Sequence, residues 1–416
     1  MAGVDPEAAL VELENLLSGV FGILVSHVQI SYDQYSLNSL NGFFESDGTD
    51  YFFKFHQEEG EEDMKGEYYR AELLVDAELP VDMPVWKSTL PGEQILVYAR
   101  RKDRRFSDVL RQLDVSPDEI ATMKAVTAER DLNSKIVKFA LQTLHPVNAA
   151  EVTNEPIHHL FHERMIDLKT GKPPGGRYQD FYIDRSFEFP GCELSWEQFA
   201  HAKLSLNGQL MKSTIGEIFK SALRDLNPSN LTGAGGITAH GDAHNANVWF
   251  VDQGHHAKLS YFDPAFAGLN IPSLIAEVKA TFHNVFAHPF WLYDPDVAQE
   301  RYVVDAEYSG GVLSIQTDWQ LNKVRENLLD AKIEAFWKPF LHELANRNML
   351  PPNWRQTIRS AFAMCPTLVM NLRAGAGRHN VISSAIGFYV TGLAGSEPEV
   401  GRNLFTDFFD RIDPES

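Results

Sequence analysis

The stretch that decides the fold is ITAHGDAHNANVWF, residues 237–250. Between two apolar ends it carries five short polar side chains: His240, Asp242, His244, Asn245 and Asn247. Core strands avoid such groups, because burying an unpaired charge is costly. The stretch is therefore either a solvated turn or a functional site.

The residues that follow predict a β-hairpin. VWFV at 248–251 and AKLSYF at 257–262 are strand-like, and the residues between them are typical of a turn. In an antiparallel pair, the start of the first strand and the end of the second lie together. We therefore expect Asn247 and Asp263 side by side, with Asp242 on the loop that leads to them. An amide and a carboxylate oxygen suit Mg²⁺, and a second carboxylate nearby can accept a proton.

Phosphoryl transfer requires this combination of groups. Kinase catalytic loops carry a base Asp, an Asn five residues later that holds Mg²⁺, and a metal-binding Asp after the hairpin. The form His-Gly-Asp-x-His-x-x-Asn resembles the catalytic loop of the aminoglycoside phosphotransferase and choline kinase-like family. The resemblance implies an α+β, two-lobed protein-kinase-like fold with ATP and Mg as cofactors. It also implies Asp242 as the catalytic base and Asn247 and Asp263 as metal ligands.

The resemblance extends to the lysine that binds the α/β-phosphates of the nucleotide. Such a lysine lies on a strand of the small lobe and is oriented by a glutamate of the following helix. Lys54 is the lone cation in the aromatic strand YFFKFH, residues 51–56. An edge-strand lysine that points to water is the alternative. Glu67 is the expected partner of Lys54, and Glu72 is the other candidate.

Two further segments are expected to contact the nucleotide. ILVYA at 95–99 resembles the strand that enters the adenine-binding hinge, which makes Val97 and Ala99 candidate binding residues. Segment 35–42 would cover the phosphates; it is not glycine-rich, but Ser36 and Asn38 would offer N–H and hydroxyl donors. The family also places an Asp at the head of the next helix, and segment 268–274 has none. The sequence leaves open what holds the catalytic loop in its place.

The length and charge of the chain bound the remaining possibilities. A chain of 416 residues is long for one core, so we expect two parts: a nucleotide-binding lobe at 1–99 and a helical catalytic and acceptor-binding lobe at 100–416. The basic run 100–105 would form the junction. A net charge of −20 argues against a nucleic-acid partner. Two separated cysteines and no signal peptide or apolar span predict a cytoplasmic protein without a membrane partner. The oligomeric state is left open.

Several secondary-structure elements can be predicted. Residues 5–19 form an amphipathic pattern typical of a helix, and NGFFES and YFFKFH predict a hairpin across Asp47-Gly48-Thr49. Helical periodicity also extends over 58–77, 196–226, 316–348 and 354–373.

Other polar residues have competing interpretations. The segment IHHLFHERM at 157–165 lacks zinc-ligand spacing, and His255 and His256 fit a solvated turn. His240 is interpreted as a hydrogen-bond hub, whereas His244 could be structural or could contact a phosphate. Two aromatic and acidic stretches, 178–188 and 283–296, could form the acceptor wall or could simply pack; the candidates that they contain include Asp184, Trp291 and Tyr293.

The sequence thus predicts a small-molecule kinase that transfers the γ-phosphoryl group of ATP to a hydroxyl group. The acceptor could be an aminoglycoside-like compound, an amino alcohol or a sugar-like molecule, and the donor could be GTP instead. The alternative is a catalytically inactive relative that binds a nucleotide or a metabolite.

Overall fold

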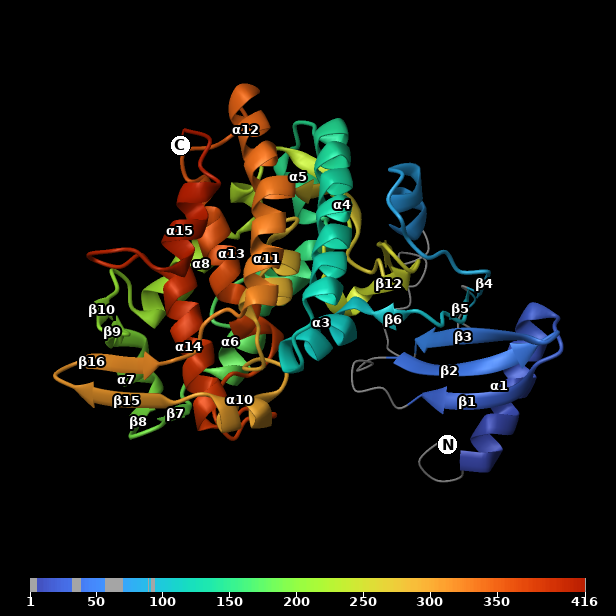
Figure 1. Cartoon of the computed structure of the whole chain (residues 1–416), viewed down its shortest axis with the longest axis horizontal. Coiled ribbons are helices and arrows are strands. Elements are labelled where there is room, and N and C mark those ends of the chain that lie inside the picture. Colours follow the sequence, from blue (N-terminus) through green and yellow to red (C-terminus); the bar gives the residue numbers. More distant parts are fainter. Residues whose placement is uncertain (1–5, 32–38, 57–69, 89, 91–93, 416) are drawn as a thin grey trace.

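The computed structural model describes residues 6–31, 39–56, 70–88, 90 and 94–415. It is an α+β structure with a strand-rich N-terminal part and a larger, mostly helical C-terminal part (Figure 1). Two separate hydrophobic clusters form the cores, a small one under the N-terminal sheet and a large one that extends through the helices. The predicted α+β class is therefore confirmed.

The N-terminal sheet has five antiparallel strands in the order β1-β2-β3-β5-β4. The strands are β1 (Ser26–Ser31), β2 (Ser39–Ser46), β3 (Thr49–His56), β4 (Trp86–Ser88) and β5 (Ile95–Ala99), and α1 (Pro6–Phe21) precedes them. Leu13 and Leu17 of α1 pack with Phe53 and Val97 of the sheet. The hairpin prediction is confirmed: Asp47 and Gly48 have φ values of 48° and 71°, as a two-residue type I′ turn requires.

The chain after the sheet's third strand is attached to the helical part. Residues 70–76 are helical, and Leu74 and Leu79 belong to the large core. Just beyond them, the Tyr261 backbone N–H donates to the Pro80 carbonyl (2.7 Å), and the Asp82 N–H donates to the Tyr261 carbonyl (2.9 Å). The segment at Pro80–Asp82 is thus hydrogen-bonded to Tyr261, two residues before Asp263. The domain boundary after Ala99 stays a prediction.

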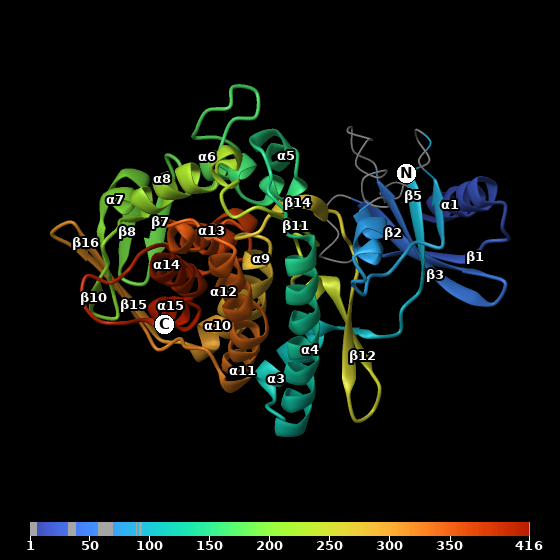
Figure 2. The ribbon, with the colours of Figure 1, turned by 90° about the horizontal axis from the view of Figure 1, so that it is seen from above.

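The basic run leads into β6 (Arg104–Arg105), which pairs with β12. The helices of the C-terminal part are α3 (Phe106–Val115), α4 (Glu119–Thr143), α5 (Ala149–Thr153), η1 (Pro156–Leu160), η2 (His162–Arg164), α6 (Gly176–Phe181), α7 (Trp196–His201), α8 (Ile215–Asp225), η3 (Pro228–Asn230), η4 (Asn245–Asn247), α9 (Val278–Thr281), η5 (Phe282–Phe286), α10 (Pro295–Arg301), α11 (Lys323–Lys332), η6 (Ile333–Trp337), α12 (Lys338–Asn346), α13 (Trp354–Val369), α14 (Val381–Gly395) and α15 (Leu404–Arg411). Its further strands are β7 (Ser186–Phe189), β8 (Cys192–Ser195), β9 (Lys203–Leu206), β10 (Gln209–Leu210), β11 (Gly236–Ala239), β12 (Val248–Asp252), β13 (Ala257–Tyr261), β14 (Gly268–Pro272), β15 (Val304–Ser309) and β16 (Val312–Thr317). The β12–β13 hairpin lies between α4 and the N-terminal sheet in both ribbon views (Figures 1 and 2).

The prediction of a continuous helix over 196–226 is wrong. The segment forms α7, then the β9–β10 hairpin, then α8. The turn is Asn207-Gly208, with φ values of 47° and 80°, and this Asn-Gly pair is the hairpin signal that the helical periodicity obscured. The helix predicted from residue 316 likewise begins only at Lys323, because 312–317 are β16, which pairs in parallel with β9.

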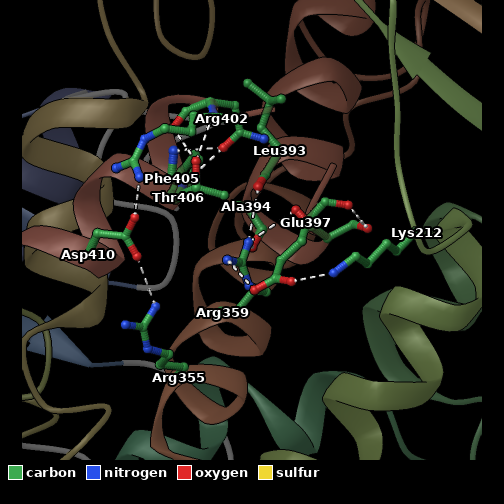
Figure 3. Close-up of polar contacts among 12 residues, drawn as sticks. Lys212, Arg355, Arg359, Leu393, Ala394, Glu397, Arg402, Phe405, Thr406 and Asp410 are labelled. Atoms are coloured by element: carbon green, nitrogen blue, oxygen red, sulfur yellow. Dashed lines mark hydrogen bonds and ion pairs between the residues drawn. The ribbon is translucent and has the colours of Figure 1, made fainter. Parts of the chain in front are cut away.

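The C-terminal helices are held together by charged side chains (Figure 3). Arg359 of α13 donates to three carbonyl oxygens at the end of α14, those of Leu393, Ala394 and Ser396. Its guanidinium also lies 3.8 Å from the Glu397 carboxylate, which Lys212 binds at 2.8 Å. The buried Arg359, which caps the C-terminus of α14, thus has the Glu397 carboxylate as its counter-charge.

Among the residues described, no helix is both long and apolar enough to cross a membrane. Cys192 and Cys365 form no disulfide. The cytoplasmic location stays a prediction.

Candidate active site

The polar stretch of the sequence forms a tight loop between β11 and β12. Gly241 has a φ of +74°, and a Cβ at this position would lie 2.3 Å from the Phe266 carbonyl oxygen. Only glycine satisfies both conditions. The turn that it permits directs Asp242 into the protein, where the residue is 6% exposed. The stretch is a buried polar cluster and not a solvated turn.

His240 is the hydrogen-bond hub that the sequence predicts. Its Nδ1 accepts from the Asp242 backbone N–H (3.3 Å), so its Nε2 carries the proton and donates to the Phe262 carbonyl oxygen (3.1 Å). Burial lowers the pKa of His240 and keeps the ring neutral. The side chain thus joins the loop to the far strand of the hairpin, which is a structural role.

The hairpin brings Asn247 and Asp263 to one end, as predicted. Val248 pairs with Tyr261, and one step outward the Phe262 N–H donates to the Asn247 carbonyl (3.0 Å). The Asn247 side-chain Nδ2 donates to the Asp242 carbonyl (3.0 Å), which leaves its amide oxygen as the atom available to a cation. An amide oxygen and the Asp263 carboxylate are ligand types that Mg²⁺ accepts. The donor set therefore fits Mg²⁺, although the ligand assignment stays a prediction.

Lys54 lies at this same point. Its Nζ is 2.9 Å from Asp263 Oδ1, with 14% of the lysine side chain and 40% of the aspartate side chain exposed. The contact crosses from β3 of the N-terminal sheet to the end of the hairpin, 209 residues away in the chain. Lys54 is therefore not an edge-strand lysine that points to water.

The other predicted nucleotide contacts are only partly described. Glu67, Ser36 and Asn38 lie outside the described residues, so the choice between Glu67 and Glu72 as partner of Lys54 stays open. Val97 is fully buried and its carbonyl oxygen accepts from the Val85 N–H (2.7 Å), whereas Ala99 is exposed at the end of β5. Their roles in adenine binding remain predictions.

One charged residue of the site was not anticipated from the sequence. Lys279 of α9 places its Nζ 2.5 Å from Asp242 Oδ1, and both side chains are 9% exposed. Burial alone would raise the pKa of Asp242, but the charge of Lys279, with smaller contributions from His244 and His240, lowers it. A lone cation in the apolar segment Leu274–Phe282 was the available signal.

A second group of residues holds the polar loop 240–247 against the helical part. The Asn245 backbone N–H donates to the Asn284 side-chain oxygen (2.8 Å), and the Asn284 carbonyl oxygen accepts from Arg325 (2.6 Å). Arg325 is in turn paired with Asp114 at 2.5 Å, with both side chains 1% exposed. A buried ion pair between α11 and α3 thus fixes the segment against which the loop rests.

His244 has a structural role as the N-cap of η4. Its Nδ1 accepts from the Ala246 N–H (3.3 Å), and its Nε2 lies 3.6 Å from Asp242 Oδ1. Burial lowers the pKa of His244 to about 4. A phosphate contact by this residue stays untested.

The structure shows where several residues of the two stretches proposed as an acceptor wall lie. Trp291 is fully buried and its indole N–H donates to the Phe286 carbonyl (2.9 Å), and Tyr293 is bonded to His283 (2.6 Å). Tyr182 is buried against α13, and Asp184 is exposed at a turn with a φ of +58°. Trp291 is thus a core residue, and the bland alternative of simple packing is correct for it. In the described part of the chain, no three His, Cys, Asp or Glu side chains form a metal-binding group.

These elements define an α+β fold in which a polar loop, a hairpin end and a sheet lysine meet between the strand-rich N-terminal part and the helical C-terminal part. No family model and no curated protein matches the chain. Solved structures are similar to it at low identity. One is a thermostable mutant of aminoglycoside phosphotransferase APH(4)-Ia in a ternary complex with ADP and hygromycin B (10% identity, 92% of this chain and 96% of that one, TM-score 0.42). Another is spectinomycin phosphotransferase APH(9)-Ia with ADP and spectinomycin (12%, 90% and 97%, TM-score 0.38), and a third is an ethanolamine kinase from Plasmodium vivax (9%, 88% and 81%, TM-score 0.37).

Proposed function

We propose that the chain is an ATP- and Mg²⁺-dependent phosphotransferase that acts on a hydroxyl group of a small molecule. The observation that carries the proposal is the meeting of Lys54, from the N-terminal sheet, with Asp263, next to the loop that bears Asp242 and Asn247. Lys54 thus joins three residues of segment 242–263, each of a type that phosphoryl transfer uses, although it lies 209 residues from Asp263 in the chain.

Each of these side chains has a distinct role in the proposed reaction. Asp242 would accept a hydrogen bond from the acceptor hydroxyl, orient its oxygen and take its proton as the oxygen attacks the γ-phosphorus, while the bond from the β,γ-bridging oxygen to that phosphorus breaks and ADP leaves. Lys54 would bind the α/β-phosphates, and Asn247 and Asp263 would hold the metal. Mg²⁺ held by these two residues would supply positive charge against the charge that develops during transfer. Catalysis would then come mainly from positioning and electrostatic stabilisation.

Lys279 has a place in the same proposal. Because its ammonium group touches the carboxylate of Asp242, it favours the ionised form that a proton acceptor needs. It also adds positive charge where the phosphoryl group would pass from donor to acceptor. Lys279 is therefore proposed as a residue that positions and ionises the base.

The alternative is an inactive relative that binds a nucleotide or a metabolite. The segment expected to cover the phosphates, 35–42, is not glycine-rich, which keeps this alternative in view. The presence of Lys54, Asp242, Asn247 and Asp263 disfavours it, because a pure binding protein has no need of a buried base.

The test is a screen of hydroxylated metabolites for ADP release with Mg·ATP, repeated for GDP release with Mg·GTP. With an accepted substrate, Asp242→Asn should lower turnover by roughly 10²–10⁴-fold, the contribution of a general base. Asp252→Asn is the matched control, since it removes the same charge from an exposed position of the same hairpin, where the aspartate pairs with Lys124. Near-normal turnover of Asp242→Asn would contradict the proposal. Nucleotide binding without turnover of any compound would support the inactive alternative.

A further inference from the structure

Two arginines of the helical part converge on a single oxygen atom. Arg164 Nη1 donates to the Leu368 carbonyl at 3.0 Å, and Arg177 Nη1 donates to the same oxygen at 2.9 Å and to the Val369 carbonyl at 2.8 Å. These carbonyls end α13. Each guanidinium has five N–H donors, and every hydrogen bond that the described residues make with either group uses only Nη1. The remaining donors of both groups make no hydrogen bond with the described residues, and the Arg177 guanidinium also lies 5.9 Å from the centroid of the Phe181 ring.

Two glycines permit this arrangement. A Cβ on Gly175 would lie 1.9 Å from the Asp167 backbone nitrogen. Gly176 has a φ of +49°, and a Cβ there would lie 3.0 Å from the Arg164 backbone. The chain can therefore pass directly against Arg164 only without side chains, and the next residue is Arg177. The close backbone approach at Gly175 and Gly176 therefore places Arg177 near Arg164.

No carboxylate within ion-pair distance neutralises either arginine among the residues that the structure describes. The contrast within the molecule is Arg359, which also caps a helix C-terminus but is accompanied by Glu397 (Figure 3). At the end of α14, one capping arginine is accompanied by a carboxylate. At the end of α13, two partly buried arginines lie side by side, and helix capping does not require the second one. Adjacent arginines of this kind are the usual means of binding a carboxylate or a phosphate.

Arg164, one member of the pair, lies within electrostatic reach of the candidate base Asp242. Burial, together with the charge of Arg177, lowers the pKa of Arg164 to about 10, and the charge of Asp242 acts in the opposite direction. Cys365, one turn before Leu368 on α13, is within electrostatic reach of Lys279, Asp242 and Arg164. The neighbourhood of Asp242 is thus positive, although the chain as a whole carries a charge of −20.

We infer that the acceptor carries an anionic group, a carboxylate or a phosphate, which Arg164 and Arg177 bind while its hydroxyl group meets Asp242. The inference rests on the proposed function and narrows it: cationic and neutral acceptors are excluded. Positive groups around the site would also steer such an acceptor toward an otherwise acidic protein.

The decisive experiment compares matched acceptors and matched variants. The screen contains glycerol, glycerate and glycerol 3-phosphate, together with ethanolamine, serine and larger hydroxylated compounds in neutral, cationic and anionic forms. The best acceptor should be anionic. Comparison of glycerate with glycerol 3-phosphate shows whether the site prefers a carboxylate or a phosphate. With it, Arg164→Gln and Arg177→Gln should each raise KM by roughly 10- to 100-fold, the loss of charge-assisted hydrogen bonds, with little change in KM for ATP.

Two further variants separate binding from folding. Arg177→Lys keeps a cation on the helix end but lacks the planar fork, so its KM should fall between those of the wild type and Arg177→Gln. Arg359→Gln removes a helix-capping arginine elsewhere, so it should lower the melting temperature and leave KM unchanged. A neutral or cationic best acceptor, or arginine variants that lose only stability, would overturn the inference.

A measurement of anion binding tests the arginine site independently of the proposed phosphotransferase activity. Sodium phosphate and sodium acetate, at the ionic strength of a sodium chloride control, should raise the melting temperature of the wild type more than that of Arg164→Gln/Arg177→Gln. If no compound is phosphorylated but this difference is present, the proposed function fails and the anion site stands. If turnover occurs and the difference is absent, the anion site is refuted.

Discussion

Replacing Lys279 by methionine tests the electrostatics of the site most directly. The Lys279 ammonium and the Asp242 carboxylate lie 2.5 Å apart, with 9% of each side chain exposed. Methionine has a similar length and fills much of the same space, so the variant removes the charge with little loss of packing. Asp242 would then be a buried carboxylate whose largest favourable charge is missing.

The expected cost is about 3–5 kcal/mol, the range for removing one partner of a buried ion pair. At about 2 °C per kcal/mol for a large domain, the melting temperature should fall by roughly 6–10 °C. Urea denaturation followed by tryptophan fluorescence would give the free energy of unfolding. The pKa of Asp242 should rise in the variant, because burial then acts without its main opposing charge.

Combining Lys279→Met with Asp242→Asn makes this test more specific. Since asparagine carries no charge, Lys279→Met/Asp242→Asn should be more stable than Lys279→Met alone, with a coupling of roughly 0.5–3 kcal/mol. Lys332→Met is a matched control: Lys332 is paired with Glu129 at 2.9 Å with 3% of each side chain exposed, in a pair that has no part in the proposed site. It should lose similar stability but keep its turnover. A wild-type unfolding midpoint for Lys279→Met, or no relief by Asp242→Asn, would refute the reasoning.

Two other predictions concern the metal and pH. Asn247→Ala and Asp263→Asn should each raise the Mg²⁺ concentration for half-maximal turnover by at least about 10-fold, the loss seen even for partners that only orient a ligand; an unchanged Mg²⁺ dependence would rule out their ligand role. Burial lowers the pKa of His158 and of His244 from 6.5 to about 4, so the unfolded chain binds these protons at higher pH than the folded one. Stability should therefore fall as the pH drops from about 6.5 toward 4. Glu277, whose pKa burial raises to about 7, opposes this with a single proton. Urea midpoints at pH 7, 6 and 5 measure the balance, and a midpoint that rises on acidification would contradict it.

Local sequence was sufficient wherever neighbouring residues decide the structure. The hairpin that carries Asn247 and Asp263 follows from strand alternation and a polar turn, and Asp47-Gly48 fixes the turn of the N-terminal hairpin. The hub role of His240 could also be predicted, because a polar loop that enters the core needs internal hydrogen bonds. The helix predicted over 196–226 failed because apolar periodicity was weighed above the Asn207-Gly208 turn.

Sequence alone left two interpretations of the aromatic residues open, and the structure decides between them for Trp291, which is fully buried. Trp291 and Tyr293 were candidates for an acceptor wall, since an aromatic side chain has the same appearance in a sequence whether it lines a pocket or fills a core. Burial decides between the two, and it is a property of the assembled fold.

The sequence by itself determined which groups the candidate site contains: Asp242, Asn247, Asp263 and Lys54 all lie in motifs whose spacing indicates a common site. Only the tertiary structure decided what surrounds them. Lys279 reaches Asp242 from α9, Arg325 holds the loop from α11, and Arg164 and Arg177 share an oxygen at the end of α13. The physical reason is that hydrogen bonds in a turn join residues only a few positions apart, so local sequence predicts them. Charges interact through space between segments that are far apart in the chain, and no sequence spacing predicts such contacts.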